Sequence, residues 1–140
     1  MKKRKIRSAA VTASLILLFL AGLSLVLYPS VSNFLNTVRQ TKVISHYSET
    51  VGEIGSAEYE RMLGDAGKYN EKLRKNGWGG GGKEYGDLLN VDGNGMIGYI
   101  EIKKIGVTLP IYHGTSDGVL AGAAGHLEGT GLPVGGEGNH

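Results

Sequence analysis

The sequence predicts a mixed α+β chain in which a membrane-spanning helix and further helical segments precede a strand-rich C-terminal part. Twenty uncharged residues, Ala9 to Tyr28, are long enough as a helix to cross the hydrocarbon core of a bilayer, about 30 Å thick. Apolar residues then recur at close to 3.6-residue spacing as far as about residue 75. From Met96 to Tyr112, apolar and polar residues alternate with a period of two, which is typical of half-buried β-strands.

The first residues and the apolar run predict how the chain meets a membrane. Residues 1–8 carry five Lys or Arg residues, and the next basic residue after the run is Arg39. The positive-inside rule therefore places residues 1–8 in the cytoplasm, makes residues 9–28 a transmembrane signal-anchor helix and leaves the remainder extracellular. A cleaved signal peptide, with Ser-Val-Ser at residues 30–32 as a poor cleavage site, is the alternative. The run exceeds the roughly 7–15 apolar residues of signal peptides, which favours a retained anchor.

Residues 31–75 are predicted to form a helical stalk that packs on the strands. Gly52 and Gly55 interrupt the helical pattern, and Ser56 can cap a second helix that carries Glu58 in its first turn. Each helix has an apolar stripe, and such stripes mark packing surfaces. The stripe residues are Val31, Phe34, Leu35, Val38, Tyr47, Val51 and Ile54 in the first helix, and Tyr59, Met62, Leu63, Ala66, Tyr69 and Leu73 in the second.

Residues 76–86, with the sequence NGWGGGGKEYG, are predicted to be a flexible linker because four glycines follow one another. They include Trp78, the one tryptophan of the chain. Residues 77–83 have the spacing of a phosphate-binding loop, but Glu84 stands where Ser or Thr must bind magnesium. Residues 93–98 match G-x-G-x-x-G, yet a strand rather than a helix follows them. No nucleotide site and no cofactor are therefore expected.

The strand-rich part consists of two predicted strands and a short helical segment. The first strand is expected to bury Ile100 and Ile102, and residues 103–106 connect it to the second strand. Pro110 cannot donate a hydrogen bond to a neighbour, so the second strand is expected to be an edge strand or to bulge there. Small residues at 117–125 predict one or two helical turns, capped by Ser116 or Asp117, and residues 132–136 read as an extended loop.

Two patterns in the strand-rich part are similar to metal sites. Asp92 begins a stretch like a calcium loop, but Ile97 stands where that loop requires Gly, so a tight turn is predicted. His113, His126 and His140 are too far apart in sequence for two ligands on one helical face. A histidine beside glycine is more often a turn residue or a hydrogen-bonding residue of the core, so no metal site is expected.

Composition excludes further classes of protein. The net charge is +2, but the chain without its first five basic residues has 10 basic and 13 acidic residues, a net charge of −3. No basic face therefore argues for nucleic acid. The absence of cysteine excludes a disulfide framework. The 24 glycines, concentrated after residue 77, raise the entropy cost of ordering, and the roughly sixty strand-rich residues make a weak core by themselves, so an incomplete domain is expected.

The strings GYIEI, KIGVTLPIYHGT and GHLEGTGLPVGG follow one another between Leu88 and His140. Together they resemble the first strands of a sortase barrel, in particular that of the class C or pilin-type sortases. The resemblance implies an amino-terminal fragment of such an enzyme. Its predicted fold is a membrane-anchored mixed α+β fold, with an N-terminal transmembrane helix, a helical stalk and, in residues 87–140, the first strands of an incomplete sortase-type β-barrel.

The resemblance also implies an activity, that of a membrane-bound cysteine transpeptidase of Gram-positive bacteria. Such an enzyme cleaves LPxTG-type sorting signals and polymerises pilins or anchors surface proteins, so sorting signals and the lipid bilayer are the implied partners. The family's catalytic Cys, His and Arg lie further along, the His a few residues after His140. No catalytic residue is therefore expected in this chain, which is predicted to be inactive alone. His126 and His140 match non-catalytic histidine positions of the family.

Two segments depart from the family or are similar to its substrate. Residues 76–86 correspond to a lid with an Asp-Pro-aromatic motif, but the Asp-Pro pair is missing, which leaves Trp78 as a possible lid remnant. Residues 132–136 (LPVGG) are similar to a sorting signal, but no apolar stretch and basic tail follow, so a barrel loop is predicted. A non-catalytic membrane-anchored extracellular binding module, or a decayed sortase, remains the alternative, and a secreted structural fragment is a third.

Overall fold

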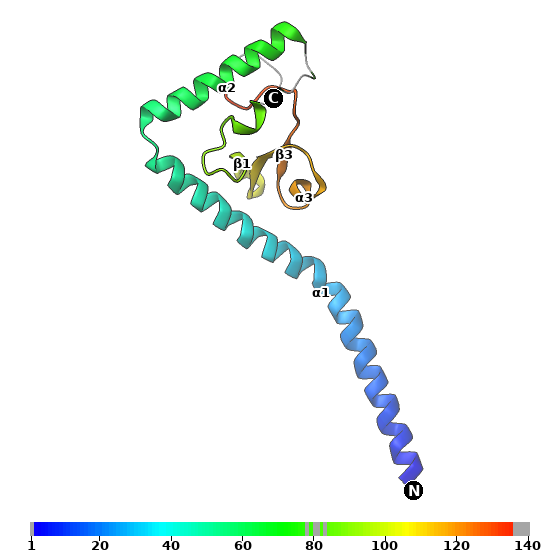
Figure 1. Cartoon of the computed structure of the whole chain (residues 1–140). Helices are drawn as coiled ribbons and strands as arrows, with labels where there is room; N and C mark the ends of the chain where they lie inside the picture. Colours follow the sequence, from blue (N-terminus) through cyan, green and yellow to red (C-terminus); the bar gives the residue numbers. More distant parts are fainter. Residues whose placement is uncertain (1, 78, 80–81, 83, 136–140) are drawn as a thin grey trace. The chain divides into compact units, whose positions relative to one another are not determined.

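The structure, a computed structural model, describes residues 2–77, 79, 82 and 84–135, with side chains from residue 10 onward. It divides into two compact units, residues 1–38 and residues 39–140. The helices are α1 (Lys2–Glu53), α2 (Ser56–Asn76) and α3 (Asp117–Leu120), with short 3-10 helices η1 (Tyr85–Asp87) and η2 (Lys103–Ile105); the strands are β1 (Met96–Ile102), β2 (Val107–His113) and β3 (Ala124–His126) (Figure 1). The predicted mixture of helices and strands is confirmed.

The first unit is the N-terminal part of α1. The helix continues through Pro29, without a break between the predicted membrane segment and the predicted stalk. The large apolar side chains from Val11 to Val38 are between 41% and 78% exposed. This stretch is long and apolar enough to cross a membrane, and a signal sequence passes the same test.

The second unit begins with the C-terminal part of α1, which is followed by α2. The predicted interruption is confirmed, because α1 ends at Glu53 and α2 starts at Ser56. The prediction that Ser56 caps α2 is wrong: Gly55 occupies the cap position, and no side chain caps the helix. Gly55 instead accepts the amide protons of Glu58 and Tyr59 with its carbonyl oxygen. Acidic and basic residues alternate along the exposed side of α2, whose ion pairs contribute little because water screens them.

The three strands form one sheet in the order β1-β2-β3, in which β2 is antiparallel to β1 and parallel to β3. The two predicted strands are confirmed, with a bulge in β1 between Met96 and Gly98. The expectation that the second strand is an edge strand or bulges at Pro110 is wrong for the strand as a whole, because β2 is the central strand and the bulge lies in β1. Pro110 is nevertheless tolerated: it pairs with Tyr99 on one side, while β3 begins only opposite Ile111.

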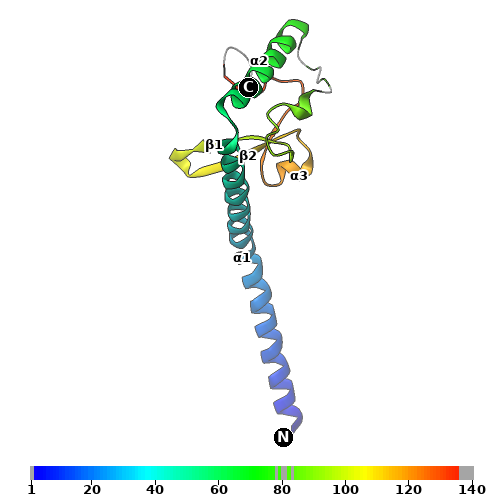
Figure 2. The same cartoon turned by 60° about the vertical axis from the view of Figure 1, so that its left-hand side comes forward.

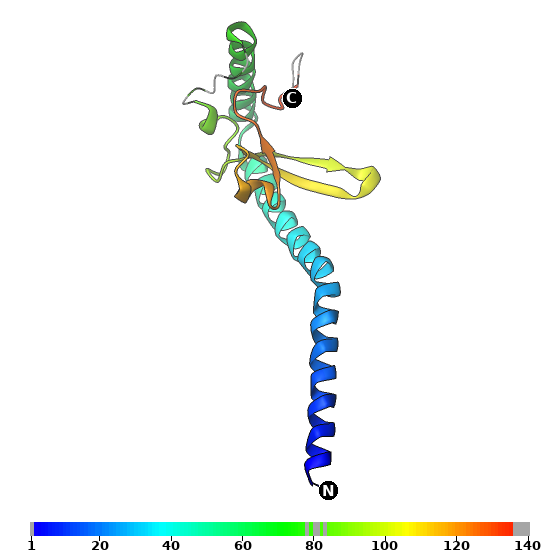
Figure 3. The same ribbon diagram turned by 90° about the vertical axis from the view of Figure 1, so that its right-hand side faces the viewer.

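The β1–β2 hairpin extends well past the short strand β3, as Figures 2 and 3 show. Its burial decreases along its length. Met96 and Ile97 are buried, whereas Ile100 is 44% and Ile102 is 40% exposed, so the predicted burial of these two isoleucines is not observed. Gly106 closes the connection after η2 with a φ of +63°, a conformation that glycine adopts without strain.

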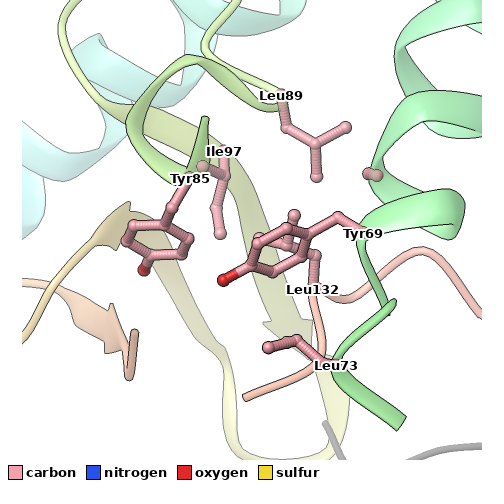
Figure 4. Packing of buried hydrophobic residues seen from close by; sticks show 7 residues of the cluster. Tyr69, Leu73, Tyr85, Leu89, Ile97 and Leu132 are labelled. Atoms are coloured by element: carbon pink, nitrogen blue, oxygen red, sulfur yellow. The ribbon is translucent and has the colours of Figure 1, made fainter. Parts of the chain in front are cut away.

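The core of the second unit lies between α2, η1 and the base of the sheet. Its buried members, which Figure 4 shows as sticks, are Ala66, Tyr69, Leu73, Tyr85, Leu89, Ile97 and Leu132. The C-terminal part of α1 adds Tyr47, whose hydroxyl donates a 3.1 Å hydrogen bond to the carbonyl oxygen of Ile97. Ala66, Tyr69 and Leu73 of α2 share this cluster with Ile97 of β1, while Tyr59 at the start of the α2 stripe is 40% exposed.

The turn that leads into β1 is held by side-chain hydrogen bonds. Asp92 Oδ1 accepts the amide proton of Asn94, and Asn94 Oδ1 accepts that of Met96 at 2.8 Å. Asn90 Oδ1 accepts the amide proton of Gly95, whose φ is +85°. These bonds are typical of Asx turns, which confirms the predicted tight turn.

Candidate functional site

Two histidines and a tyrosine meet at the C-terminal ends of β2 and β3. His113 and His126 are opposite each other in the parallel register of the two strands. Tyr85, from η1, lies against both: its ring centroid is 4.7 Å from that of His113, edge to face, and 5.7 Å from that of His126. Figure 4 shows the Tyr85 hydroxyl pointing toward the sheet. We call these three residues the Tyr85–histidine cluster.

The Tyr85 hydroxyl connects three backbone or side-chain groups. It lies 2.8 Å from the carbonyl oxygen of His126 and 2.9 Å from Nδ1 of the same residue. It also accepts the amide proton of Gly114, at 3.2 Å, from the end of β2. Burial raises the pKa of this hydroxyl, so Tyr85 stays protonated and keeps its donor. A single phenol therefore ties the ends of β2 and β3 together.

The hydrogen bonds of His126 define its tautomer. The carbonyl oxygen of Gly131 lies 2.8 Å from Nε2 and can only accept, so Nε2 carries the proton. Nδ1 is then an acceptor, and it shares the single proton of the Tyr85 hydroxyl with the carbonyl oxygen of His126. Thr130 Oγ1 lies 3.4 Å from Nε2 and donates its own proton to the carbonyl oxygen of Leu127. Both nitrogens of His126 are thus engaged, which suits an anchoring residue better than a proton-transfer residue.

His113 is in a different situation. Both ring nitrogens are buried, and neither has a hydrogen-bond partner among the residues that the structure describes. Burial is the largest cause that lowers the pKa of this imidazole, and the proximity of His126 lowers it further, while the nearby backbone of Gly95 opposes the shift without forming a hydrogen bond to the ring. His113 therefore favours the neutral form near pH 7.

Two hollows flank α2 in the second unit. One, of about 490 Å³, lies between α2 and η1 and has a charged rim that includes Arg61, Lys68, Glu84 and Asp87. The other, of about 500 Å³, lies between α1, α2 and β1 and has no charged residue in its lining. Neither is lined by the Tyr85–histidine cluster, and the chain contains no cysteine that could act as a nucleophile.

The structure describes some of the candidate site residues predicted from the sequence but not others. Trp78 and His140 lie outside the described residues, so the proposed lid remnant stays a prediction. His113 and His126 come together, and His126 is a hydrogen-bonding residue as expected. The described residues contain no group of three or more His, Cys, Asp or Glu side chains that could hold a metal ion.

Sequence reasoning missed Tyr85, which organises the cluster. The residue lies near the end of the predicted flexible linker (76–86), where the structure has the buried start of η1 instead, and it is 41 positions from its partner His126. An aromatic side chain in such a position indicates an anchor only when the opposing strand is known. The signal that could have indicated Tyr85 is its residue type, because a tyrosine in a core usually finds a hydrogen-bond partner for its hydroxyl.

Solved structures similar to this chain are sortases of class C. Sortase C1 from Streptococcus agalactiae matches with 36% identity and a TM-score of 0.63, over 68% of this chain and 52% of that one. Sortase C from Clostridium perfringens SM101 matches with 38% identity and a TM-score of 0.58, over 69% and 52%. Sortase C from Streptococcus pneumoniae matches with 38% identity and a TM-score of 0.57, over 69% and 52%.

The match is partial in both directions. This chain spans about half the length of these sortases. A further similar structure is the Clostridium perfringens enzyme in complex with a C-terminal cell wall sorting signal motif, at 38% identity. No protein-family model and no curated protein matches the chain.

Proposed function

We propose that this class C sortase-like chain supplies the helical stalk and the first strands of the barrel of a pilin-type sortase. The observation that carries the proposal is the combination of 36–38% identity with TM-scores of 0.57–0.63 to class C sortases over two thirds of the chain. A likeness of fold alone would not imply a function, so the proposal rests on the sequence identity together with the fold. The antiparallel and parallel pairing of β1, β2 and β3 agrees with the resemblance read from the same residues.

The reaction of the whole enzyme is thiol-based transpeptidation. A cysteine thiolate attacks the threonine carbonyl carbon of an LPxTG-type signal, the Thr–Gly amide bond breaks, and a histidine protonates the leaving amine. The resulting thioester is attacked by a lysine amine of a pilin, which forms an isopeptide bond and returns the thiolate. An arginine stabilises the developing oxyanion. This chain has no cysteine. The resemblance to class C sortases implies that the catalytic His and Arg follow His140.

The same proposal includes a cellular location. Residues 1–8 lie in the cytoplasm, residues 9–28 cross the membrane once, and the stalk (31–75), linker (76–86) and barrel part (87–140) lie outside. The exposed apolar side chains of the first unit and the basic residues before them support this topology. Protease added to intact spheroplasts is expected to digest the part after residue 38 and to spare the N-terminal tail.

A peptide-cleavage assay tests the activity. The 140-residue chain alone is expected to leave an LPxTG peptide intact, because it has no thiol nucleophile. The product of the complete reading frame is expected to cleave the same peptide, and a thiol-alkylating reagent is expected to abolish that cleavage. Cleavage by the 140-residue chain, or a complete product that ignores the peptide, would contradict the proposal and favour a non-catalytic binding module.

A further inference from the structure

The segment from His126 to Leu132 leaves the end of β3 and is held at both ends by side chains from outside the sheet. At its C-terminal end, Asn70 of α2 makes two hydrogen bonds with the backbone of Leu132. Asn70 Nδ2 donates to the carbonyl oxygen at 2.8 Å, and Asn70 Oδ1 accepts the amide proton at 2.7 Å. The side-chain amide thus pairs with Leu132 as a neighbouring strand would.

The N-terminal end of the segment is held by Tyr85. Its hydroxyl bonds to the carbonyl oxygen of His126 and to Nδ1 of the ring, whose other nitrogen bonds to Gly131 at the far end of the same segment. The His126 ring therefore ties both ends of this turn to one phenol.

A third contact lies between these two ends. The amide of Gly79 donates to the carbonyl oxygen of Gly129 at 3.2 Å, and a Cβ on Gly129 would lie only 2.9 Å from the Cα of Gly79. The segment is thus contacted along its length by α2 and by residues that precede β1.

We propose that Asn70 and Tyr85 are positioning residues, which together set the path of the chain from His126 to Leu132. The inference rests on the proposed function, in which the residues that follow this segment lead to the catalytic histidine. In this proposal α2, through Asn70, and η1, through Tyr85, fix the direction in which the chain continues toward the catalytic histidine. Neither residue touches the reacting atoms.

Burial makes these two residues effective. Leu132 is fully buried, so its backbone amide has no access to water and depends on Asn70, while its carbonyl oxygen also accepts the amide proton of Val134 at 2.8 Å. Tyr85 is 6% exposed, and its hydroxyl serves groups from both β2 and β3. Loss of either side chain leaves buried polar groups unpaired, which costs more than the bond itself contributes.

Tyr69 provides a matched control for Tyr85. The two rings are neighbours in the core, with centroids 6.2 Å apart, and both are nearly buried. The Tyr69 hydroxyl, however, has no partner at hydrogen-bond geometry among the described residues, although the backbone of Gly129 lies near enough to oppose the rise of its pKa on burial. Tyr85→Phe and Tyr69→Phe therefore remove the same atom from the same core, and only the first change removes hydrogen bonds of ordinary geometry to the segment.

Hydrogen exchange of the complete 140-residue chain in detergent micelles tests the proposal. In Tyr85→Phe, the amide of Gly114 is expected to exchange at least about fivefold faster, because it loses its acceptor. The ¹⁵N shifts of His126 are expected to change, because Nδ1 loses its donor. Tyr69→Phe is expected to change neither. Equal effects of the two variants, or no effect of Tyr85→Phe, would overturn the role of Tyr85.

Asn70→Asp tests the other end of the segment. The aspartate side chain has the shape of asparagine and keeps an oxygen that can accept the Leu132 amide proton, but its second oxygen faces the carbonyl oxygen of Leu132. These two oxygens repel each other, so faster exchange of the Leu132 amide is expected. Asn76→Asp, at the exposed end of the same helix, is the control and is expected to leave that amide unchanged. Unchanged exchange in Asn70→Asp would overturn the role of Asn70. If one variant exchanges faster throughout the second unit, its fold is disturbed as a whole. The other variant then tests the proposal, because the two residues hold opposite ends of the segment from His126 to Leu132.

These exchange measurements need no enzymatic activity, so their outcome is independent of the peptide-cleavage assay. In the product of the complete reading frame, Tyr85→Phe and Asn70→Asp are expected to lower kcat several-fold at similar KM, and Tyr69→Phe is not. If the expected changes in hydrogen exchange occur but kcat is unchanged, both residues have a purely structural role, and their assignment as positioning residues is overturned.

Discussion

At the scale of single residues, His113 shows how burial changes a side chain's chemistry. Its ring packs edge to face on Tyr85, faces His126 across the register of β2 and β3, and keeps both nitrogens out of water. Desolvation disfavours the charged form, so the pKa of His113 lies below its usual value. The ring thus behaves as an aromatic core residue with two unused polar atoms.

This shift predicts a dependence of stability on pH. The unfolded chain, in which the pKa of His113 is about 6.5, binds more protons than the folded chain below that pH. His113 therefore leaves the free energy of unfolding unchanged above about pH 6.5, and lowers it as the pH falls from there toward the pKa of His113 in the folded chain. The urea midpoint of the second unit is expected to decline from pH 7.5 to pH 5.5. In His113→Phe, which keeps the aromatic packing on Tyr85, the decline should be smaller; an undiminished decline would exclude His113 as its cause.

Tyr47 supports a second prediction at this scale. Burial raises the pKa of its hydroxyl to about 12, so the phenol remains a donor to the carbonyl oxygen of Ile97. Tyr47→Phe leaves that carbonyl unpaired and is expected to destabilise the second unit by about 1 kcal/mol. Tyr59→Phe is the matched control, because Tyr59 is 40% exposed and its loss should cost little. Urea unfolding followed by circular dichroism distinguishes the two, and equal midpoints would contradict the assigned hydrogen bond.

At the scale of elements, two glycines with the same backbone conformation differ in their surroundings. Gly129 has a φ of +82° and Gly135 a φ of +81°, so alanine is strained at both by about 1–2 kcal/mol. A Cβ on Gly129 would also meet Gly79 at 2.9 Å, whereas nothing lies within 4 Å of one on Gly135. Gly129→Ala is therefore expected to unfold at a lower urea concentration than Gly135→Ala. Equal midpoints would show that Gly79 does not pack on Gly129.

The elements with regular patterns could be predicted from the sequence. Gly52 and Gly55 predicted the end of α1, because glycine interrupts helices, and alternation predicted β1 and β2. The strand β3 could not be predicted, since its three residues, Ala124 to His126, are small or polar and show no alternation. It pairs with β2 in parallel, and parallel strands are not joined by a tight turn, so the sequence between them contains no turn residues that would predict the pairing.

The same reason explains what was missed in the site. The bonds of Tyr85 to His126 and of Asn70 to Leu132 join residues 41 and 62 positions apart. Each depends on where β3 and the segment after it lie, which no local pattern specifies. By contrast, a role for His126 in the core could be predicted as one of two alternatives, because a histidine beside glycine is more often a turn residue or a hydrogen-bonding residue of the core, but its partner Tyr85 could not be predicted. The exposure of Ile100 and Ile102 could not, since alternation predicts a buried face without showing what covers it.

At the scale of the whole molecule, the second unit has a small core and a long exposed hairpin. Seven residues form the buried cluster, while Tyr99, Ile100, Ile102 and Ile105 of the hairpin are 40–65% exposed. Exposed strands of this kind favour association with other strands. These properties agree with a chain that spans about half the length of the class C sortases it matches.

The central claim is that this chain forms the first part of a class C sortase barrel. Sequencing the coding DNA beyond codon 140 tests it most directly. The account predicts an open reading frame that encodes a His-Arg pair within a few residues and a Thr-x-Thr-Cys-type strand further along. A stop codon at that position, or a continuing frame without any cysteine-bearing strand, would contradict the claim.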